Sequence, residues 1–208
     1  DYDAKITVAG KKTALWEHIQ KTTFPGVQGT PYLNNVAAKA VFFKETLGEQ
    51  YRARQFKIVQ NAKRLAQSLL GLGHDVLTGG TDNHMALINV GRVEGVPPSN
   101  RGQDARDTGT TGLVAQRCLE DCGIIVNRNR LPYDSRGAAV AGGIRVGTPI
   151  VTRNGMGPEQ MDAIAAIVDE VLRHVKVVSD KQYELDESFK RQTQEKVKDL
   201  CHQFPIQV

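Results

Sequence analysis

GGIRVGTP, residues 142–149, alternates in the manner of a short β-strand. Ile144 and Val146 share one face, which we expect to be buried, and Arg145 lies between them on the opposite face. A guanidinium held on a strand presents a planar fork to two carboxylate oxygens, and each charge-assisted hydrogen bond is worth roughly 1.5–3 kcal/mol. Arg145 is therefore a candidate carboxylate-binding residue. The alternative is an ordinary surface arginine on an edge strand.

The segments around this strand alternate between strands and helices. Upstream, residues 124–126 (IIV) predict a strand, and residues 85–90 (MALINV) predict another that is buried on both faces. Downstream, Pro158 begins a helix whose apolar side chains recur every three or four residues to about residue 175. Further strands are expected at residues 5–9 and 76–77, and further helices at residues 13–20, with Thr13 as the cap, 32–47, 50–70, 111–121 and 180–200.

Two segments lack such a pattern. Residues 24–31 (FPGVQGTP) predict a loop, because two prolines and two glycines oppose regular pairing. Residues 91–112 are poor in large apolar side chains and predict a long surface excursion. The alternation elsewhere predicts an α/β fold or an α+β small domain, with a mostly antiparallel sheet covered by helices on one face.

The composition is that of an ordinary soluble globular protein. Of the 208 residues, 40% are hydrophobic and 24% are charged, and the net charge is +4. Lysines and arginines are interleaved with acidic residues, which argues against a nucleic-acid-binding surface. No apolar run approaches the length of a membrane span, and the start, DYDAKITVAG, does not resemble a signal peptide. We expect a cytoplasmic protein with no nucleic-acid or membrane partner.

Cysteine spacing gives little support for a metal site. Cys118 and Cys122 stand four residues apart on a predicted helix, and no second pair of ligands accompanies them. We interpret both as small apolar core residues.

Several further blocks accompany GIRVGTP in a fixed order. They are FPGVQG at residues 24–29, AAKAV at residues 37–41 followed by Lys44-Glu45, GGTDNH at residues 79–84, and Asn-Arg-Asn at residues 127–129. In this order and spacing, from about residue 12 to 175, the chain resembles the C-terminal part of serine hydroxymethyltransferase. That family comprises pyridoxal 5'-phosphate enzymes of the aspartate-aminotransferase fold type, called fold type I, which interconvert serine and glycine with tetrahydrofolate.

The resemblance implies a domain organisation. Residues 1–48 would be the end of the large domain that binds pyridoxal phosphate, residues 49–178 the small C-terminal domain, and residues 179–208 a helical tail. It also implies a homodimer or a higher homo-oligomer.

The resemblance further implies roles for four residues. Arg145 matches the arginine that binds the α-carboxylate of the substrate, serine or glycine, and Asn129 matches an asparagine that contacts the folate. Gly29 and Thr30 match a loop that holds the cofactor phosphate across the dimer interface, although Thr30 replaces a usual glycine. The residues alone also favour an anion here, because this loop precedes a helix N-terminus.

Two departures keep other functions open. Residues 137–142 read GAAVAG where the family usually has Ser-Pro-Phe-Val-Thr-Ser, so hydroxyls and an aromatic ring near the folate are absent. A folate-independent aldolase or transaldolase acting on β-hydroxy amino acids is the first alternative. Family order also places the Schiff-base lysine upstream of residue 1, so we expect the chain to be inactive alone. A non-catalytic assembly module is the second alternative.

Overall fold

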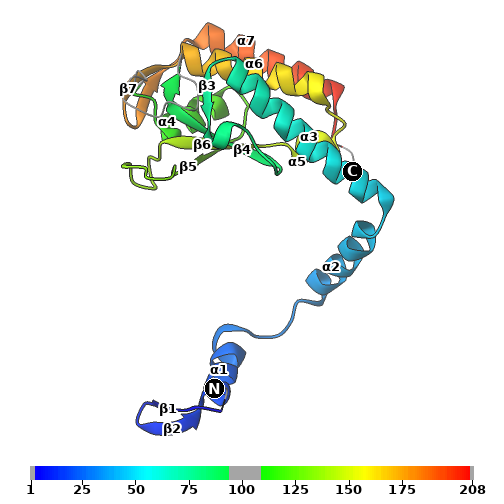
Figure 1. Ribbon diagram of the computed structural model, residues 1–208, viewed down its shortest axis with the longest axis vertical. Helices are drawn as coiled ribbons and strands as arrows, with labels where there is room; N and C mark the ends of the chain where they lie inside the picture. The colour runs from blue at the N-terminus through cyan, green and yellow to red at the C-terminus, as the bar shows by residue number, and fades with distance from the viewer. Residues whose placement is uncertain (1–2, 94–108, 207–208) are drawn as a thin grey trace. The chain divides into compact units, whose positions relative to one another are not determined.

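A computed structural model describes residues 3–93 and 109–206 of the chain, which divide into two compact units, Asp1–Gly48 and Glu49–Val208 (Figure 1). Each unit is described by itself. Most of the predicted excursion at residues 91–112 lies outside the described residues. Among those that are described, none of the helices combines the length and the apolar character that a membrane crossing requires.

The first unit is a hairpin followed by helices. Strands β1 (Lys5–Val8) and β2 (Lys11–Ala14) pair antiparallel, with Ile6 opposite Thr13. Helix α1 (Leu15–Lys21) continues into a π-helical turn, η1 (Thr22–Val27). Helix α2 (Leu33–Thr46) follows after a short extended segment. No residue between 3 and 48 is buried.

One prediction for the first unit is wrong. Residues 11–14 form a strand, so Thr13 does not cap a helix; its hydroxyl donates instead to the Glu17 carboxylate at 2.9 Å. The loop predicted at residues 24–31 is confirmed in part: the backbone is extended at Phe24 and at Gln28, and only the turn around Pro25 belongs to η1.

The second unit contains a four-stranded sheet whose strands all pair antiparallel. Its order is β3-β4-β6-β5, formed by β3 (His74–Val76), β4 (Met85–Val93), β6 (Gly143–Gly147) and β5 (Asn127–Asn129). The prediction of a mostly antiparallel sheet is confirmed. A 3₁₀ turn, η2 (Leu77–Gly79), follows β3.

The helices of this unit are α3 (Glu49–Gly71), α4 (Gly112–Asp121), α5 (Pro149–Arg153), α6 (Pro158–His174) and α7 (Glu187–Gln203). A second hairpin, β7 (Lys176–Ser179) and β8 (Gln182–Glu184), connects α6 to α7. Figure 1 shows α3 and α6 side by side over the sheet, with α7 beyond α6.

One hydrophobic core lies between the sheet and these helices. Its largest fully buried side chains come from both layers: Leu69, Ile88, Leu119, Ile144 and Met161. Phe189 and Leu200 of α7 pack against the same core, so residues 187–203 lie in one unit with the sheet. The domain boundaries drawn from the sequence stay a prediction.

Three sequence predictions for this unit are corrected. Residues 124–126 are not a strand, and β5 begins only at Asn127. From Met85 to Val90 the buried residues alternate with half-buried ones, so only one face of this part of β4 is fully covered. The last helix begins at Glu187 rather than at residue 180, because the β7–β8 hairpin occupies the intervening residues.

Buried polar bonds fix the end of β6 to α3. The Thr148 hydroxyl donates to the carbonyl of Ile58 at 2.8 Å, and the Thr148 amide donates to the carbonyl of His84 at 3.0 Å. Asn61 of α3 donates to the Thr152 hydroxyl and to the Met156 carbonyl, both at 2.9 Å. Each donor is thereby satisfied within the core, where an unpaired polar group would be costly.

Candidate functional site

Strand β6 presents Arg145 on the face of the sheet that points away from the core. Ile144 is 0% exposed and Val146 is 8% exposed, whereas the intervening Arg145 is exposed, which confirms the predicted alternation. The register places Asn127 of β5 on one side of Arg145 and Leu87 of β4 on the other. Directly opposed residues point to the same face, so these two neutral side chains flank the guanidinium.

The Arg145 guanidinium has no acceptor among the residues that the structure describes. Within residues 3–93 and 109–206, it makes neither a hydrogen bond nor an ion pair. The neighbouring Arg128 points to the opposite face, where it donates to Gln116 of α4 at 3.1 Å. The fork of Arg145 is therefore available to a carboxylate from outside these residues.

Asn129 lies on the same face as Arg145. It pairs with Gly143 and is two residues from Asn127, so its side chain is a diagonal neighbour of Arg145, at about 7–8 Å by usual strand geometry. Its carboxamide nitrogen donates to the carbonyl of Arg130 at 2.5 Å. The register thus brings two of the predicted site residues to adjacent strands.

Asn127 is a neighbour that sequence reasoning did not single out as a site residue. It directly opposes Arg145 and is exposed. An amide oxygen beside a guanidinium can orient it without neutralising its charge. Only the register identifies this position, because both asparagines of the Asn-Arg-Asn motif are equally visible in the sequence.

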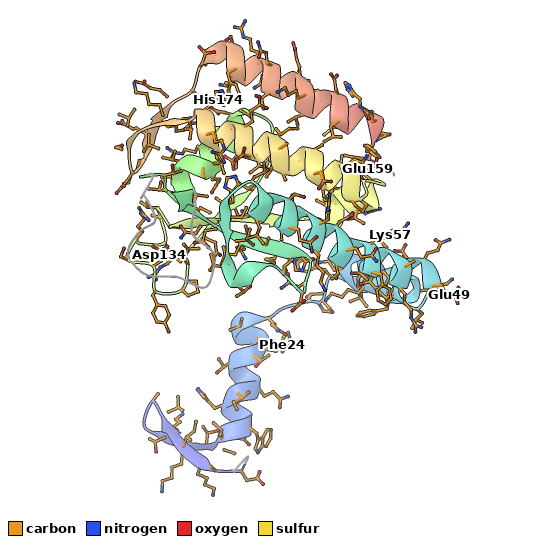
Figure 2. All side chains as sticks on the ribbon, turned by 45° about the horizontal axis from the view of Figure 1, so that its top comes forward. Phe24, Glu49, Lys57, Asp134, Glu159 and His174 are labelled. Atoms are coloured by element: carbon orange, nitrogen blue, oxygen red, sulfur yellow. The ribbon has the colours of Figure 1, made fainter. Side chains whose placement is uncertain are left out.

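The loop between β5 and β6 is organised by Asp134 (Figure 2). Its carboxylate accepts from the backbone amides of Gly142 at 2.7 Å, Arg136 at 2.9 Å and Leu131 at 3.2 Å. Burial would raise the pKa of the Asp134 carboxyl, but these three donors and the charge of Arg136 together lower it below its ordinary value. The ionised carboxylate therefore holds both ends of the loop.

The two glycines before Ile144 are required by close approaches. A Cβ on Gly142 would lie 3.1 Å from an Asp134 carboxylate oxygen. A Cβ on Gly143 would overlap the Leu131 side chain and the Ile88 carbonyl. Glycine, which lacks a Cβ, permits these close approaches.

Gly29 and Thr30 lie in the first unit, and so are described apart from Arg145 and Asn129. Both are exposed, and a Cβ on Gly29 would meet nothing within 4 Å. Helix α2 starts three residues after Thr30 without a side-chain cap, since Tyr32 supplies only its carbonyl. The first amides of α2 are open to an external acceptor, which fits a phosphate.

His84 and His74 differ in their exposure to solvent and in their hydrogen-bond partners. His84 is exposed, and no bond joins it to Asp82 among the described residues; Asp82 instead pairs with Lys63 at 3.5 Å. His74 is buried. Its Nε2 lies 2.8 Å from Asp169, and its Nδ1 has no hydrogen-bond partner among the described residues. Burial lowers the pKa of His74, although Asp169 acts in the opposite direction. Neither histidine joins a metal-binding cluster in the described part of the chain.

Cys118 and Cys122 are buried core residues, as predicted. Burial raises the pKa of the Cys118 thiol to about 12, so it stays protonated at neutral pH.

The sequence model of one family, described as "Serine hydroxymethyltransferase", matches residues 4–168. The chain belongs to the serine hydroxymethyltransferase family. The match covers most of the chain and includes Gly29, Thr30, Asn129 and Arg145. It confirms the resemblance carried by the ordered sequence blocks. Members of the serine hydroxymethyltransferase family are transferases that generally depend on pyridoxal phosphate.

Proposed function

We propose that this chain supplies the substrate-binding strand and a phosphate-binding loop of a pyridoxal-phosphate transferase that interconverts serine and glycine with tetrahydrofolate. The observation that carries the proposal is the open guanidinium of Arg145 on β6. It is exposed, flanked by neutral side chains and without an internal acceptor among the described residues. An amino-acid carboxylate matches such a fork.

In this proposal Arg145 binds and orients the α-carboxylate of serine or glycine. Strand β6 is hydrogen-bonded to a strand on each side, which holds its backbone in place. The Arg145 backbone therefore loses little conformational freedom when substrate binds. Asn127 directly opposes Arg145 on the adjacent strand, where its carboxamide would accept from the guanidinium once a carboxylate is bound. The Asp134-bound loop keeps β5 and β6 in register beside it.

Asn129 would contact tetrahydrofolate, because a carboxamide offers both a donor and an acceptor to a pterin edge. A second candidate function is a folate-independent aldolase or transaldolase acting on β-hydroxy amino acids. It is favoured by the exposed residues 137–139, which carry neither a hydroxyl nor a ring.

Gly29, Thr30 and the open amides of α2 would hold the cofactor phosphate. When bound, pyridoxal phosphate supplies an electron sink for breaking bonds at the substrate Cα. The residue that forms the Schiff base lies outside residues 1–208 in this proposal, so the chain would not act alone. The exposed apolar side chains of α2, Leu33, Val36 and Phe43, support burial against further protein, in a cytoplasmic homodimer or higher homo-oligomer.

The test replaces Arg145 in the full-length protein loaded with pyridoxal phosphate. Arg145→Ala is expected to weaken glycine binding by about tenfold or more, since it removes a charge-assisted pair. The glycine affinity of Arg145→Lys should lie between those of the wild type and Arg145→Ala, because lysine keeps the positive charge but lacks the planar fork of the guanidinium. Calorimetric titration with glycine measures the effect, and the bound cofactor per protomer should not change. Arg153→Ala, at an exposed arginine of α5, is the matched control.

Unchanged glycine affinity in Arg145→Ala would contradict the assignment. Serine cleavage measured with and without tetrahydrofolate separates the two candidate functions. Strict dependence on tetrahydrofolate supports the transferase, and equal rates support the aldolase.

A further inference from the structure

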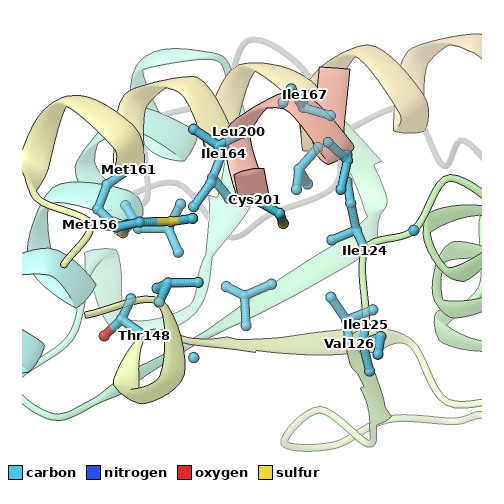
Figure 3. A pocket seen from close by; sticks show the side chains of 17 residues that line it. Ile124, Ile125, Val126, Thr148, Met156, Met161, Ile164, Ile167, Leu200 and Cys201 are labelled. Atoms are coloured by element: carbon cyan, nitrogen blue, oxygen red, sulfur yellow. The ribbon is translucent and has the colours of Figure 1, made fainter. Parts of the chain in front are cut away.

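An apolar cavity of about 200 Å³ lies within the second unit, on the core side of β6 (Figure 3). Its walls come from α6, α7, the end of β6 and residues 124–126. Met156 and Met161 lie at one end of the cavity, and residues 124–126 lie at the other. The cavity therefore sits on the opposite side of the sheet from the Arg145 guanidinium.

The side chains that line the cavity are almost all apolar. None of the 17 lining residues is charged, and only Thr148 and Cys201 carry a hydroxyl or a thiol. The Thr148 hydroxyl already donates to the Ile58 carbonyl at 2.8 Å. A water molecule needs two to four polar partners, and the side chains that line this space offer few, so they favour an apolar occupant over water.

The cavity walls are well supported. Met161 is 0% exposed, Val168 2% and Val146 8%, so the floor belongs to the packed core. The opposite wall is formed by Val197, Leu200 and Cys201 of α7. The first two are half-buried and Cys201 is exposed, and Ile125 at the other end is 88% exposed, so the cavity opens to solvent beside α7 and beside Ile125. Methionines at one end add adaptable, polarisable surface.

We propose that this cavity binds the hydrocarbon part of a small apolar ligand, of about six to eight carbon atoms. Dry apolar cavities of about 150 Å³ hold benzene, so the space here suits a ring of that size or a short alkyl chain. The uncharged side chains of the walls disfavour a charged group, and any polar end of the ligand would remain at a solvent-facing opening, beside α7 or beside Ile125. This site is distinct from the proposed amino-acid and phosphate sites, and its occupancy does not depend on them.

The methionines allow a direct test. The chain has three, and Met156 and Met161 line the cavity while Met85 of β4 does not. Met85 opposes Gly147, which is two residues from Arg145 on the same strand. Residues two apart share a face, so the Met85 side chain lies on the Arg145 face of the sheet, away from the cavity. The full-length protein is labelled with ¹³C at the methionine methyl groups, assigned by single Met→Leu variants, and titrated with benzene. Saturable shifts are expected for Met156 and Met161, with Met85 unchanged.

A cavity-filling variant sharpens the test. Ile164 of α6 lines the cavity, whereas its neighbour Ala163 is exposed. Ile164→Phe should weaken benzene binding by about tenfold or more, and Ala163→Phe, which adds a ring to the same helix outside the cavity, should leave binding unchanged. Val197→Phe, from α7, gives a second filling variant if Ile164→Phe does not fold.

Three results would overturn the proposal. They are the absence of saturable shifts up to the solubility of benzene, shifts at Met85 as large as those at Met156 and Met161, and equal binding in the filling variants and the control.

Discussion

Leu33 of α2 and Leu69 of α3 are the same residue type on consecutive helices, yet Leu33 is 73% exposed and Leu69 is 0% exposed. The contrast extends to the units that contain them. None of residues 3–48 is buried, whereas the second unit encloses a continuous hydrophobic core. Apolar periodicity therefore identifies a helix face that needs covering, but not what covers it.

The difference has an energetic consequence. Each residue ordered on folding costs about 1–2 kcal/mol of backbone conformational entropy, and buried apolar area is the main compensation. The second unit has that compensation within its own residues. The first unit has helices and a hairpin without a core, so its order must depend on protein beyond its own residues.

The largest expected effect comes from separating the units. A fragment of residues 49–208 should unfold cooperatively on heating, because its core is internal. A fragment of residues 1–48 should show no cooperative transition. Circular dichroism during thermal melting measures both. A sharp transition in the shorter fragment would remove the distinction between the units.

Matched leucine truncations compare the units within one chain. Leu69→Ala should lower the free energy of unfolding by about 3–5 kcal/mol, because it leaves a cavity in a packed core. Leu33→Ala should change it by less than about 0.5 kcal/mol in the 208-residue chain. Urea denaturation measures both values. Similar costs at the two positions would mean that α2 is covered within the chain.

A smaller effect concerns pH. His74 is buried, and its lowered pKa means that the unfolded chain takes up a proton more readily than the folded one. Stability is complete above the ordinary histidine pKa of about 6.5 and decreases as the pH falls toward the lowered folded value. Urea midpoints at pH 7.5 and 5.5 should therefore differ. His74→Gln should reduce that difference, and His18→Gln, in the first unit, should retain it.

The smallest expected effect is local. Asp134→Asn replaces the carboxylate that accepts three backbone amides. Hydrogen exchange at Leu131, Arg136 and Gly142 should become roughly fivefold faster, which corresponds to a net loss of about 1 kcal/mol. Glu17→Gln, which alters the Thr13 contact of the first unit, is the control and should leave these amides unchanged.

The wild-type loop should respond to pH in the same way. The lowered pKa of Asp134 means that its stabilisation is complete above the ordinary aspartate pKa of about 3.9 and is lost as the pH falls through the folded value. Protection that persists below pH 2 would show that the carboxylate charge does not hold the loop.

The sequence predicts the long helices of the second unit well, because their periodicity continues over many residues. It misplaces β5, because Ile124, Ile125 and Val126 are as apolar as a buried strand. The Ile124 amide instead donates to the Leu119 carbonyl at 2.8 Å and terminates α4, so pairing begins only at Asn127. It also misses the β7–β8 hairpin, whose strands are short and largely exposed.

The candidate site is predictable in part. The outward direction of Arg145 follows from its two apolar neighbours, because strand side chains alternate. Its position beside Asn127 and Asn129 does not follow, because a register shift of one residue would move both asparagines to the other face. The role of Asp134 also leaves no sequence pattern, since its partners are backbone amides.

Thr148 sets an unusual constraint on how this protein can change over time. Its hydroxyl reaches the carbonyl of Ile58, 90 positions earlier in the chain. Because that acceptor is a backbone atom, exchanging the side chain at position 58 does not remove it, and only a substitution at position 148 can. For this one hydrogen bond, the constraint on sequence change therefore falls on Thr148 and not on the side chain at position 58.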